Sequence, residues 1–389
     1  MYDNKIYWIF IQQSLGYGSK KVKEILSVFK SAKDFYHAGY KDWELSKLFS
    51  ESELNKLKNF KFSLAEDILL ECENKDYKIL TLEDQKYPVR LKNIYNPPAV
   101  LFVKGNFPEI DDVMTISIVG TRNATEYGKR VAFYFGKNLA HLGAVIVSGG
   151  ALGIDLTAQK GALRASGKVI SVLGCGLSSH YLSNTLDTKK QIINSGAVIS
   201  EYLPSCKPFP SNFPLRNRII SGLSLGTIIV EADLKSGALI TARWALDQNR
   251  DVFSVPGNIT SRKSRGTNKL IKNGAKPVSC IEDILEEYYA VCPKLNIIKN
   301  SLEKRSFKNE GTSNKNNTKK KIVKQEKTLP QNISENAKCL FDNLSYNFSN
   351  MNDLILKTDL DVPNFLQAVT ELELYNLIKV GPGRNYSKL

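Results

Sequence analysis

The sequence has few of the residues that commonly hold metals or form disulfides. It contains three histidines and six cysteines in 389 residues, and no two cysteines form a C-x-x-C pair. No histidine stands at metal-ligand spacing from a cysteine, a glutamate or another histidine. This pattern argues against a zinc site and against a disulfide framework. We therefore expect reduced cysteines that serve packing, and no resident metal.

Long apolar runs are also missing. No run approaches the roughly 20 apolar residues that a membrane-spanning helix needs. The apolar stretch from Ile6 to Ile11 is too short for a signal peptide, and no small-residue cleavage site follows it. These absences predict a cytoplasmic protein that has no membrane partner.

The glycine motifs of common nucleotide-using enzymes are absent as well. The sequence has no G-x-x-x-x-G-K-[ST] phosphate loop, and no G-x-G-x-x-G follows the first strand predicted below. No histidine or cysteine nucleophile can be paired with a base at the predicted strand ends. We therefore expect no catalytic residue and no cofactor, although Asp155, Glu201 and Glu231 leave an acid or base role open.

Positive charge, in contrast, is in excess. The formal net charge is +15, which suggests a polyanionic partner such as nucleic acid. Residues 294–327 hold eleven Lys or Arg and three Glu, a net charge of +8. This segment is rich in Asn and Lys and poor in apolar residues, which predicts a flexible linker over residues 292–332. The linker is either a solvated spacer or an arm that attracts DNA.

The length of the chain suggests two to three folding units. We predict an all-helical unit over residues 1–78, an α/β unit over 79–291 and a winged-helix unit over 333–389, with the linker before the last. In the first unit apolar residues recur at helical spacing. They are Ile6, Ile9 and Phe10, then Val22, Ile25 and Phe29, then Leu64, Ile68 and Leu69.

One short segment of the helical unit has two interpretations. The stretch Leu15-Gly16-Tyr17-Gly18 precedes a helix that carries Lys20, Lys21 and Lys23. In a helix-hairpin-helix, such glycines let a phosphate approach backbone N–H groups. The alternative is a plain turn between two helices.

From residue 113 the pattern changes to short β-branched runs that alternate with helix-length segments. The runs are Ile116 to Val119, Val145 to Val147, Val169 to Leu173, Ala197 to Ser200, Thr227 to Val230 and Val252 to Val255. Continuous apolar strands of this kind are typical of a parallel sheet that is buried on both faces. The fold class is therefore α/β, with a Rossmann-like, doubly wound and mostly parallel sheet.

The last 57 residues show a third compact pattern. Helices are predicted over 337–344 and 351–356 and from Asp361 to Leu372, and 377–384 form a wing. The third helix and the residue after it carry Asp361, Glu371 and Glu373 and no Lys or Arg, which is a poor match to a DNA major groove. This composition favours contact with a protein or a regulatory role, and it disfavours a transcription regulator that reads duplex DNA.

Ligands of an open α/β sheet bind outside the carboxyl ends of its strands, so the residues that follow each run are candidates. They are Gly120, Arg122 and Tyr127; Ser148, Gly149, Gly150, Gly153 and Asp155; Phe213, Arg216, Asn217 and Arg218; and Ser236, Gly237 and Thr241. Glycine-rich turns offer backbone N–H groups, arginines bind phosphates and an aromatic ring stacks on any base. Together these groups suit single-stranded DNA. For each arginine alone, the alternative is a structural ion pair with Glu201, Glu231 or Asp233.

Several motifs occur in the order and spacing of one known family. They are Gly120-x-Arg122-x4-Tyr127-Gly128; Ser148-Gly-Gly-x2-Gly153-Ile154-Asp155; Phe213-Pro-x-Arg216-Asn217-Arg218-Ile219-Ile220; Ser236-Gly237-x-Leu239-Ile240-Thr241; and Val255-Pro256-Gly257 with Gly266-Thr267-Asn268-x-Leu270-Ile271-x2-Gly274-Ala275. Tyr87-Pro88-x2-Leu91 and Pro97-Pro98-Ala99-Val100-Leu101 precede them. Over about residues 80 to 280 the chain thus resembles the DprA (Smf) family of recombination mediators.

The resemblance implies a homodimer that binds single-stranded DNA without catalysing a reaction on it. It also implies that the protein protects incoming DNA during natural transformation and loads the RecA recombinase onto it. The main alternative is an enzyme or sensor that binds a free nucleotide, because related Rossmann-like domains use glycine-rich loops in that way.

Overall fold

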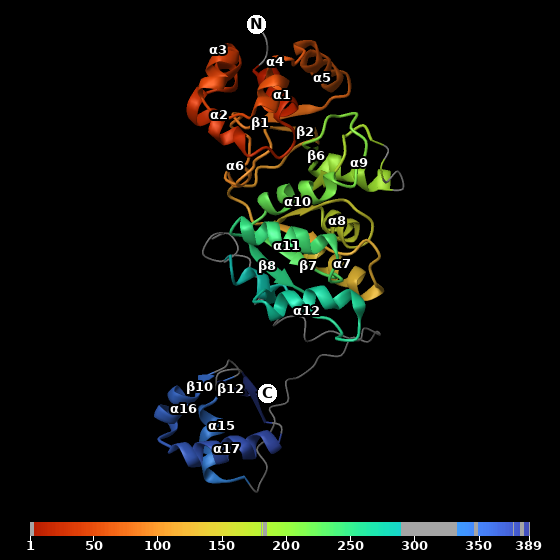
Figure 1. Cartoon of the computed structure of the whole chain (residues 1–389). Coiled ribbons are helices and arrows are strands. Elements are labelled where there is room, and N and C mark those ends of the chain that lie inside the picture. Colours follow the sequence, from red (N-terminus) through yellow and green to blue (C-terminus); the bar gives the residue numbers. More distant parts are fainter. Residues whose placement is uncertain are drawn as a thin grey trace. The chain divides into compact units, whose positions relative to one another are not determined.

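The computed structural model describes residues 4–179, 181, 185–288, 333–345, 349–375, 377–381 and 385–388. The chain divides into two compact units, Met1–Glu310 and Gly311–Leu389 (Figure 1). The linker predicted over 292–332 lies outside the described residues. Within the described ranges, no helix combines the length and the apolar character that crossing a membrane requires.

A nine-stranded sheet with the order β1-β2-β6-β5-β4-β3-β7-β8-β9 forms the centre of the larger unit. The strands are β1 (Lys78–Thr81), β2 (Val100–Gly105), β3 (Thr115–Val119), β4 (Val145–Ser148), β5 (Val169–Leu173), β6 (Ala197–Ser200), β7 (Gly226–Ile229), β8 (Asp251–Ser254) and β9 (Lys276–Pro277). Strands β3 to β9 are joined by parallel pairing, whereas β2 pairs antiparallel with β1 and β6. The predicted α/β fold is thus confirmed, and the six predicted strands are β3 to β8.

Strands β1, β2 and β9 were not predicted. β1 and β2 precede the alternation of strands and helices, which is the pattern that indicates parallel strands. β9 has only two residues, too few for a periodic signal. Local composition could not reveal these three strands, because each forms by pairing with another strand of the sheet.

Helices cover both faces of the sheet (Figure 1). The described helices of the larger unit are α1 (Lys5–Leu15), α2 (Lys21–Phe29), α3 (Ala32–Leu45), α4 (Glu51–Lys58), α5 (Phe62–Asn74), α6 (Val89–Lys92), α7 (Glu126–His141), α8 (Ile154–Arg164), α9 (Leu186–Ser195), α10 (Asn212–Gly222), α11 (Gly237–Asp247), the 3₁₀ helix η2 (Arg262–Ser264), α12 (Arg265–Lys272) and α13 (Glu282–Leu285). Side chains of a strand alternate between the two faces. Val145 and Val147 therefore join the core that includes α10 and α11, while Ile146 joins the core that includes α7 and α8.

The N-terminal region is helical from α1 to α5, as predicted. Residues Ile6 to Ile11 of α1 are buried, and they belong to the same hydrophobic core as Val100 and Phe102 of β2. Gln12 links α1 to the sheet, because its Nε2 donates to the carbonyl oxygen of Glu201 (2.8 Å) and its Oε1 accepts from the Val100 N–H (2.8 Å). Helices and sheet therefore share one core across the domain boundary predicted at residue 78.

Hydrogen bonds to the sheet region fix the turn between α1 and α2. The Gly18 N–H donates to Oε1 of Glu201 (3.1 Å), and Asn96 Nδ2 donates to the Gly18 carbonyl oxygen (3.3 Å). Gly18 has a φ of +70°, in the left-handed region that favours glycine. The Glu201 carboxylate already accepts this N–H and would repel a phosphate. The plain turn is therefore the interpretation that fits Gly18.

Glu201 also forms a buried ion pair with Arg218 of α10. Arg218 Nη2 lies 2.6 Å from Glu201 Oε1, and the side chains are 0% and 1% exposed. Arg218 Nε donates to the carbonyl oxygen of Asn96 (3.1 Å). Arg218 is among the residues predicted to bind DNA, but burial leaves its guanidinium no open surface. The structural ion pair is the interpretation that fits this residue.

The smaller unit contains α15 (Glu335–Asn343), α16 (Met351–Thr358) and α17 (Val362–Leu374) around a core of its own. Its three-stranded sheet has the order β10-β12-β11, with β10 (Ser349–Asn350), β11 (Ile378–Gly381) and β12 (Asn385–Lys388). Asp361 caps α17, since its Oδ1 accepts from the Asn364 N–H (2.9 Å), so the predicted start of this helix is confirmed. Residues 382–384 of the predicted wing lie outside the described residues, and the winged-helix assignment stays a prediction.

We expect Arg218→Ala to destabilise the larger unit, because it leaves the Glu201 carboxylate buried without its cation. Removing one partner of a buried pair costs about 3–5 kcal/mol. Urea denaturation followed by circular dichroism measures this loss in free energy of unfolding. The control is Arg243→Ala, which removes an 85% exposed arginine whose Nε lies 4.0 Å from Asp247 and should cost less than about 0.5 kcal/mol. Equal losses in the two variants would contradict the expectation.

Candidate nucleic-acid interface

A cavity of about 530 Å³ opens at the carboxyl ends of the strands. β3 lies between β4 and β7, and the chain crosses from one side of β3 to the other between β6 and β7. The loops after neighbouring strands diverge at such a point and leave room for a ligand. The walls of the cavity come from the loops after β3 and β4 and from the starts of α10 and α11.

Phe213, in the first turn of α10, forms an aromatic platform in this cavity. The guanidinium carbons of Arg122 and Arg216 lie 5.2 and 5.8 Å from the centroid of its ring, and the Tyr181 ring lies 5.3 Å from it. Gly174 leaves room for Phe213, because a Cβ at this position would lie 2.8 Å from the ring. An aromatic face beside two cations suits a base that is attached to a phosphate.

The two arginines beside Phe213 differ in burial. Arg122 follows β3 and is exposed. Arg216 is only 4% exposed, and its Nη1 donates to the carbonyl oxygens of Gly149 (2.9 Å) and Val172. Arg216 therefore fixes the loop after β4 as well as lining the cavity. Arg122 is the one whose charge is open to solvent and to a ligand.

Asp155 lies beneath the cavity, close to Arg216. A Cβ added at Gly149 would lie 2.7 Å from both Asp155 Oδ2 and Arg216 Nη2, so these two side chains meet at Gly149. Burial raises the pKa of Asp155 to about 6, while Arg216 and the N–H groups of Gly120, Gly149 and Ala151 act in the opposite direction. Burial lowers the pKa of Arg216, and the Asp155 charge opposes this. A buried arginine and a buried carboxyl group therefore lie close together at the cavity floor.

The glycine-rich loop after β4 mainly forms contacts within the protein. The Gly149 N–H donates to Asp155 Oδ2 (3.1 Å). Gly153 has a φ of +86°, and a Cβ there would lie 2.4 Å from the Thr121 carbonyl oxygen, so only glycine fits. Ser148 is fully buried, and its Oγ donates to the Ile118 carbonyl oxygen (2.6 Å). The loop thus orients Asp155 instead of presenting the Gly149 N–H to an anion.

The two glutamates considered as possible acids or bases are held by the protein frame. Glu231 accepts hydrogen bonds from the N–H (2.9 Å) and the hydroxyl of Thr125, at the start of α7. A Cβ at Gly128 would lie 2.4 Å from the Glu231 carboxyl group, which requires glycine there. Glu201 is bound by Arg218, as described above. Both carboxylates therefore anchor structure in the described part of the chain.

The cavity brings together nine of the fifteen predicted binding residues. They are Gly120, Arg122, Asp155, Phe213, Arg216, Asn217, Ser236, Gly237 and Thr241. The other six are Tyr127, Ser148, Gly149, Gly150, Gly153 and Arg218, which are not among its lining residues. The tyrosine is exposed, but its hydroxyl donates to the Pro256 carbonyl oxygen (3.1 Å). A role for any of the fifteen in DNA binding stays a prediction.

Sequence reasoning missed several lining residues. Tyr181, Pro208 and Pro210 reach the cavity from the long connections after β5 and β6, and Pro214 lines it from the first turn of α10. Two prolines just before Phe213 are a local signal of a rigid, extended loop, and they could have indicated a wall. Tyr181 had no such signal, because its place depends on the packing of the Phe213 ring.

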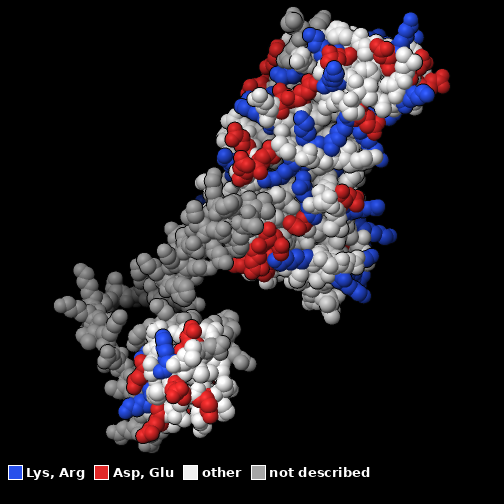
Figure 2. All heavy atoms as spheres, turned by 90° about the vertical axis from the view of Figure 1, so that its left-hand side faces the viewer, with Lys and Arg blue, Asp and Glu red and all other residues white. Residues whose placement is uncertain are grey.

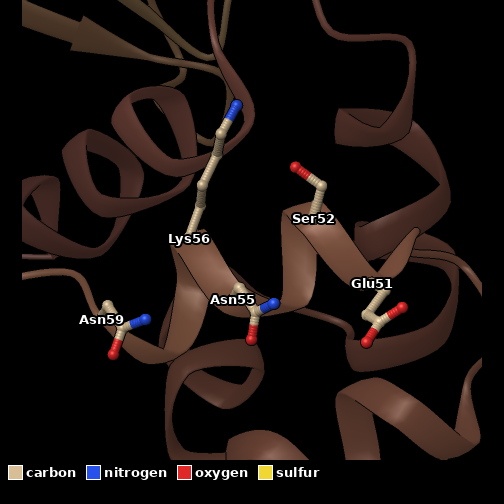
Figure 3. Close-up of a pocket in the computed structure, with 5 residues that line it drawn as sticks. All are labelled: Glu51, Ser52, Asn55, Lys56 and Asn59. Atoms are coloured by element: carbon tan, nitrogen blue, oxygen red, sulfur yellow. The ribbon is translucent and has the colours of Figure 1, made fainter.

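A second hollow, of about 560 Å³, lies beside α4 in the N-terminal region. Its lining residues are Glu51, Ser52, Asn55, Lys56 and Asn59. Four of these side chains come from α4, and Asn59 is the residue that caps its C-terminal end (Figure 3). They lack the convergence of groups from several elements that the strand-end cavity has, so this hollow is not a candidate site.

The fold and the cavity define a doubly wound α/β protein whose strand ends carry an aromatic ring flanked by cations, an arrangement suited to phosphodiester and base. The sequence profile of the family "DNA recombination-mediator protein A" matches residues 78–289. The chain belongs to this family.

Two relatives carry the names DprA and Smf. The DNA processing protein DprA of Bacillus subtilis is 44% identical over 208 residues, which are 54% of this chain and 70% of that protein. The protein Smf of Synechocystis is 34% identical over 301 residues, 74% of each chain.

Two solved structures are similar to this one. The X-ray structure of DprA from Streptococcus pneumoniae superposes with a TM-score of 0.62 at 31% identity, covering 74% of this chain and 98% of that one. DNA processing protein A from Helicobacter pylori, whose structure concerns its single-stranded DNA binding mode, has a TM-score of 0.50 at 33% identity, covering 55% of this chain and 96% of that one.

The raised pKa of Asp155 predicts a pH dependence of stability. Its value in the folded protein, about 6, lies above the ordinary 3.8. Between these values the folded state binds more protons than the unfolded chain, so the free energy of unfolding falls as pH rises through this window. Asp155→Asn stays uncharged and should lack this contribution. Urea denaturation at several pH values should show the wild-type and variant curves diverging between about pH 4 and 6; parallel curves would contradict the assignment.

Proposed function

We propose that the strand-end cavity binds single-stranded DNA and that the protein acts as a recombination mediator without enzymatic activity. The observation that carries the proposal is the exposed Arg122, whose guanidinium carbon lies 5.2 Å from the Phe213 ring centroid. A base can stack on the ring while its phosphate meets the arginine. The single-strand binding of the Helicobacter pylori relative supports the same choice of ligand.

The cavity also offers donors that do not depend on base identity. Ser236 caps α11, since its Oγ accepts from the Ala238 N–H (3.3 Å), and it places the helix N-terminus in the cavity wall. Helix N-termini favour anions. Stacking and phosphate contacts of this kind give affinity with little sequence preference.

General surface charge does not account for the proposed binding of single-stranded DNA at the cavity. Over most of the face shown in Figure 2, Lys and Arg of the larger unit are interspersed with Asp and Glu. A mixed surface attracts nucleic acid weakly and non-specifically. The proposal therefore depends on the local arrangement of Arg122, Phe213 and the α11 start.

The family description extends the proposal to a pathway. We propose that the bound strand is protected and then passed to the RecA recombinase during natural transformation, and that the protein acts as a homodimer. The support is membership of the recombination-mediator family. A free nucleotide is the competing ligand, because a doubly wound sheet binds nucleotides at the same edge.

Arg122→Ala and Phe213→Ala are each expected to weaken binding of a labelled single strand by about 1–3 kcal/mol, through loss of a phosphate contact and of a stacking surface. Fluorescence anisotropy measures the affinity. Arg164→Ala is the matched control, because Arg164 is also exposed but ends α8, ahead of the amino end of β5. Unchanged affinity in both cavity variants, with native unfolding curves, would contradict the assignment of the cavity as the binding site.

Displacement of the strand by micromolar free nucleotide would favour the alternative, a sensor that binds a free nucleotide.

The protein is expected to shield DNA without cutting it. With Mg²⁺ and ATP present, a labelled single strand should resist an added nuclease, and the protein alone should release neither DNA fragments nor phosphate. The reason is that Glu201 and Glu231 are bound by Arg218 and Thr125. Turnover that co-purifies with the protein and disappears in Glu231→Ala would instead identify an enzyme.

A further inference from the structure

An exposed aromatic ring with a lysine over it lies outside the cavity. Tyr95, in the loop after α6, is 66% exposed. Lys20, just before α2, is also exposed, and its Nζ lies 4.8 Å from the centroid of the Tyr95 ring. A cation beside an exposed aromatic ring is the combination that Arg122 and Phe213 present in the cavity.

The backbone on each side of this pair is fixed. Tyr95 precedes Asn96, whose carbonyl oxygen accepts from Arg218 Nε (3.1 Å) and whose Nδ2 donates to the Gly18 carbonyl oxygen (3.3 Å). Lys20 follows Gly18 by two residues, and the Gly18 N–H is held by Glu201. Both members of the pair therefore extend from main chain that the buried ion pair anchors. A preorganised pair of this kind loses little entropy when a ligand binds.

The turn that leads to Lys20 also packs against the helix that lines the cavity. A Cβ at Gly18 would lie 2.8 Å from the Leu215 side chain, so the turn before Lys20 packs on α10. Leu215 directly follows Pro214, which lines the cavity, and Phe213, which forms its platform. α6 and α10 are in contact. Helix α10 thus contacts the turn that leads to Lys20 and also lines the cavity.

We infer that Tyr95 and Lys20 form a second stacking site for the single strand that occupies the cavity. This inference rests on the proposed function. The Tyr95 ring takes a base and Lys20 the neighbouring phosphate, since stacking on an aromatic ring tolerates any base. A duplex does not fit this role, because its bases are already stacked on one another. The N-terminal helical region thereby lengthens the bound stretch of DNA.

The test compares short and long strands. Single-strand binding sites span about 4–16 nucleotides, so an oligonucleotide of about 5 occupies the cavity alone and one of about 20 reaches both sites. Tyr95→Ala should lower the affinity for the long strand at least about fivefold, the usual effect of losing one stacked base, and leave the short strand unchanged. Tyr95→Phe should restore long-strand affinity. Lys20→Ala should reduce the salt slope of long-strand binding by about 1.

Control variants separate this inference from the cavity itself. Tyr134→Ala removes another exposed tyrosine, 43% exposed on α7, and should leave both affinities unchanged. Arg122→Ala should weaken short and long strands alike. Equal losses for both lengths in Tyr95→Ala, or no loss for either, would overturn the second site and leave the cavity standing. Loss in Tyr95→Ala without loss in Arg122→Ala or Phe213→Ala would overturn the cavity instead.

Discussion

The buried ion pair of Glu201 and Arg218 is the interaction on which the architecture of the larger unit depends. Glu201 also accepts the Gly18 N–H, and its carbonyl oxygen accepts from Gln12, so one residue after β6 holds helix α1, the following turn and α10 together. Two charges taken out of water need such additional hydrogen bonds, because desolvation offsets much of their mutual attraction. The pair therefore contributes little net stability. Its main effect is to hold the helices in one arrangement on the sheet.

Helix α10 shows how one short sequence supplies two surfaces. Phe213 and Arg216 line the cavity. Leu215 instead packs against Gly18 of the N-terminal region, and Arg218 pairs with Glu201, which accepts the Gly18 N–H. Residues three or four apart share a helix face, and those two apart lie on opposite sides. A displacement of the N-terminal turn against Leu215 would consequently move the residues that line the cavity. The position of the helical region and the shape of the cavity are thus set by the same packing.

Much of the fold could be predicted from the sequence, because buried parallel strands leave continuous apolar runs between helix-length segments. The position of the cavity could be predicted too, since the topology of an open sheet determines which strand ends meet. That this cavity is the binding site stays a prediction. The roles of individual residues could not be predicted. Arg122 lies in the loop directly after a strand, while Arg216 and Arg218 lie in the connection between two others, and nothing in the local sequence distinguishes the three. Arg122 is exposed, Arg216 is buried near Asp155 and Arg218 is buried with Glu201. The burial and pairing of each arginine depend on residues far away in the chain, and a local sequence pattern carries no information about those residues.

The antiparallel strands β1 and β2 extend the parallel sheet at one edge, and α1 packs against them within the same core. Cooperativity follows from this arrangement. A helical region joined to an α/β domain by a loop alone would melt separately, but here the loss of α1 would expose β2 and remove the Gln12 contact to Val100. The region from α1 to α13 should thus unfold in a single transition, and the boundary that composition suggests at residue 78 is not a boundary in stability.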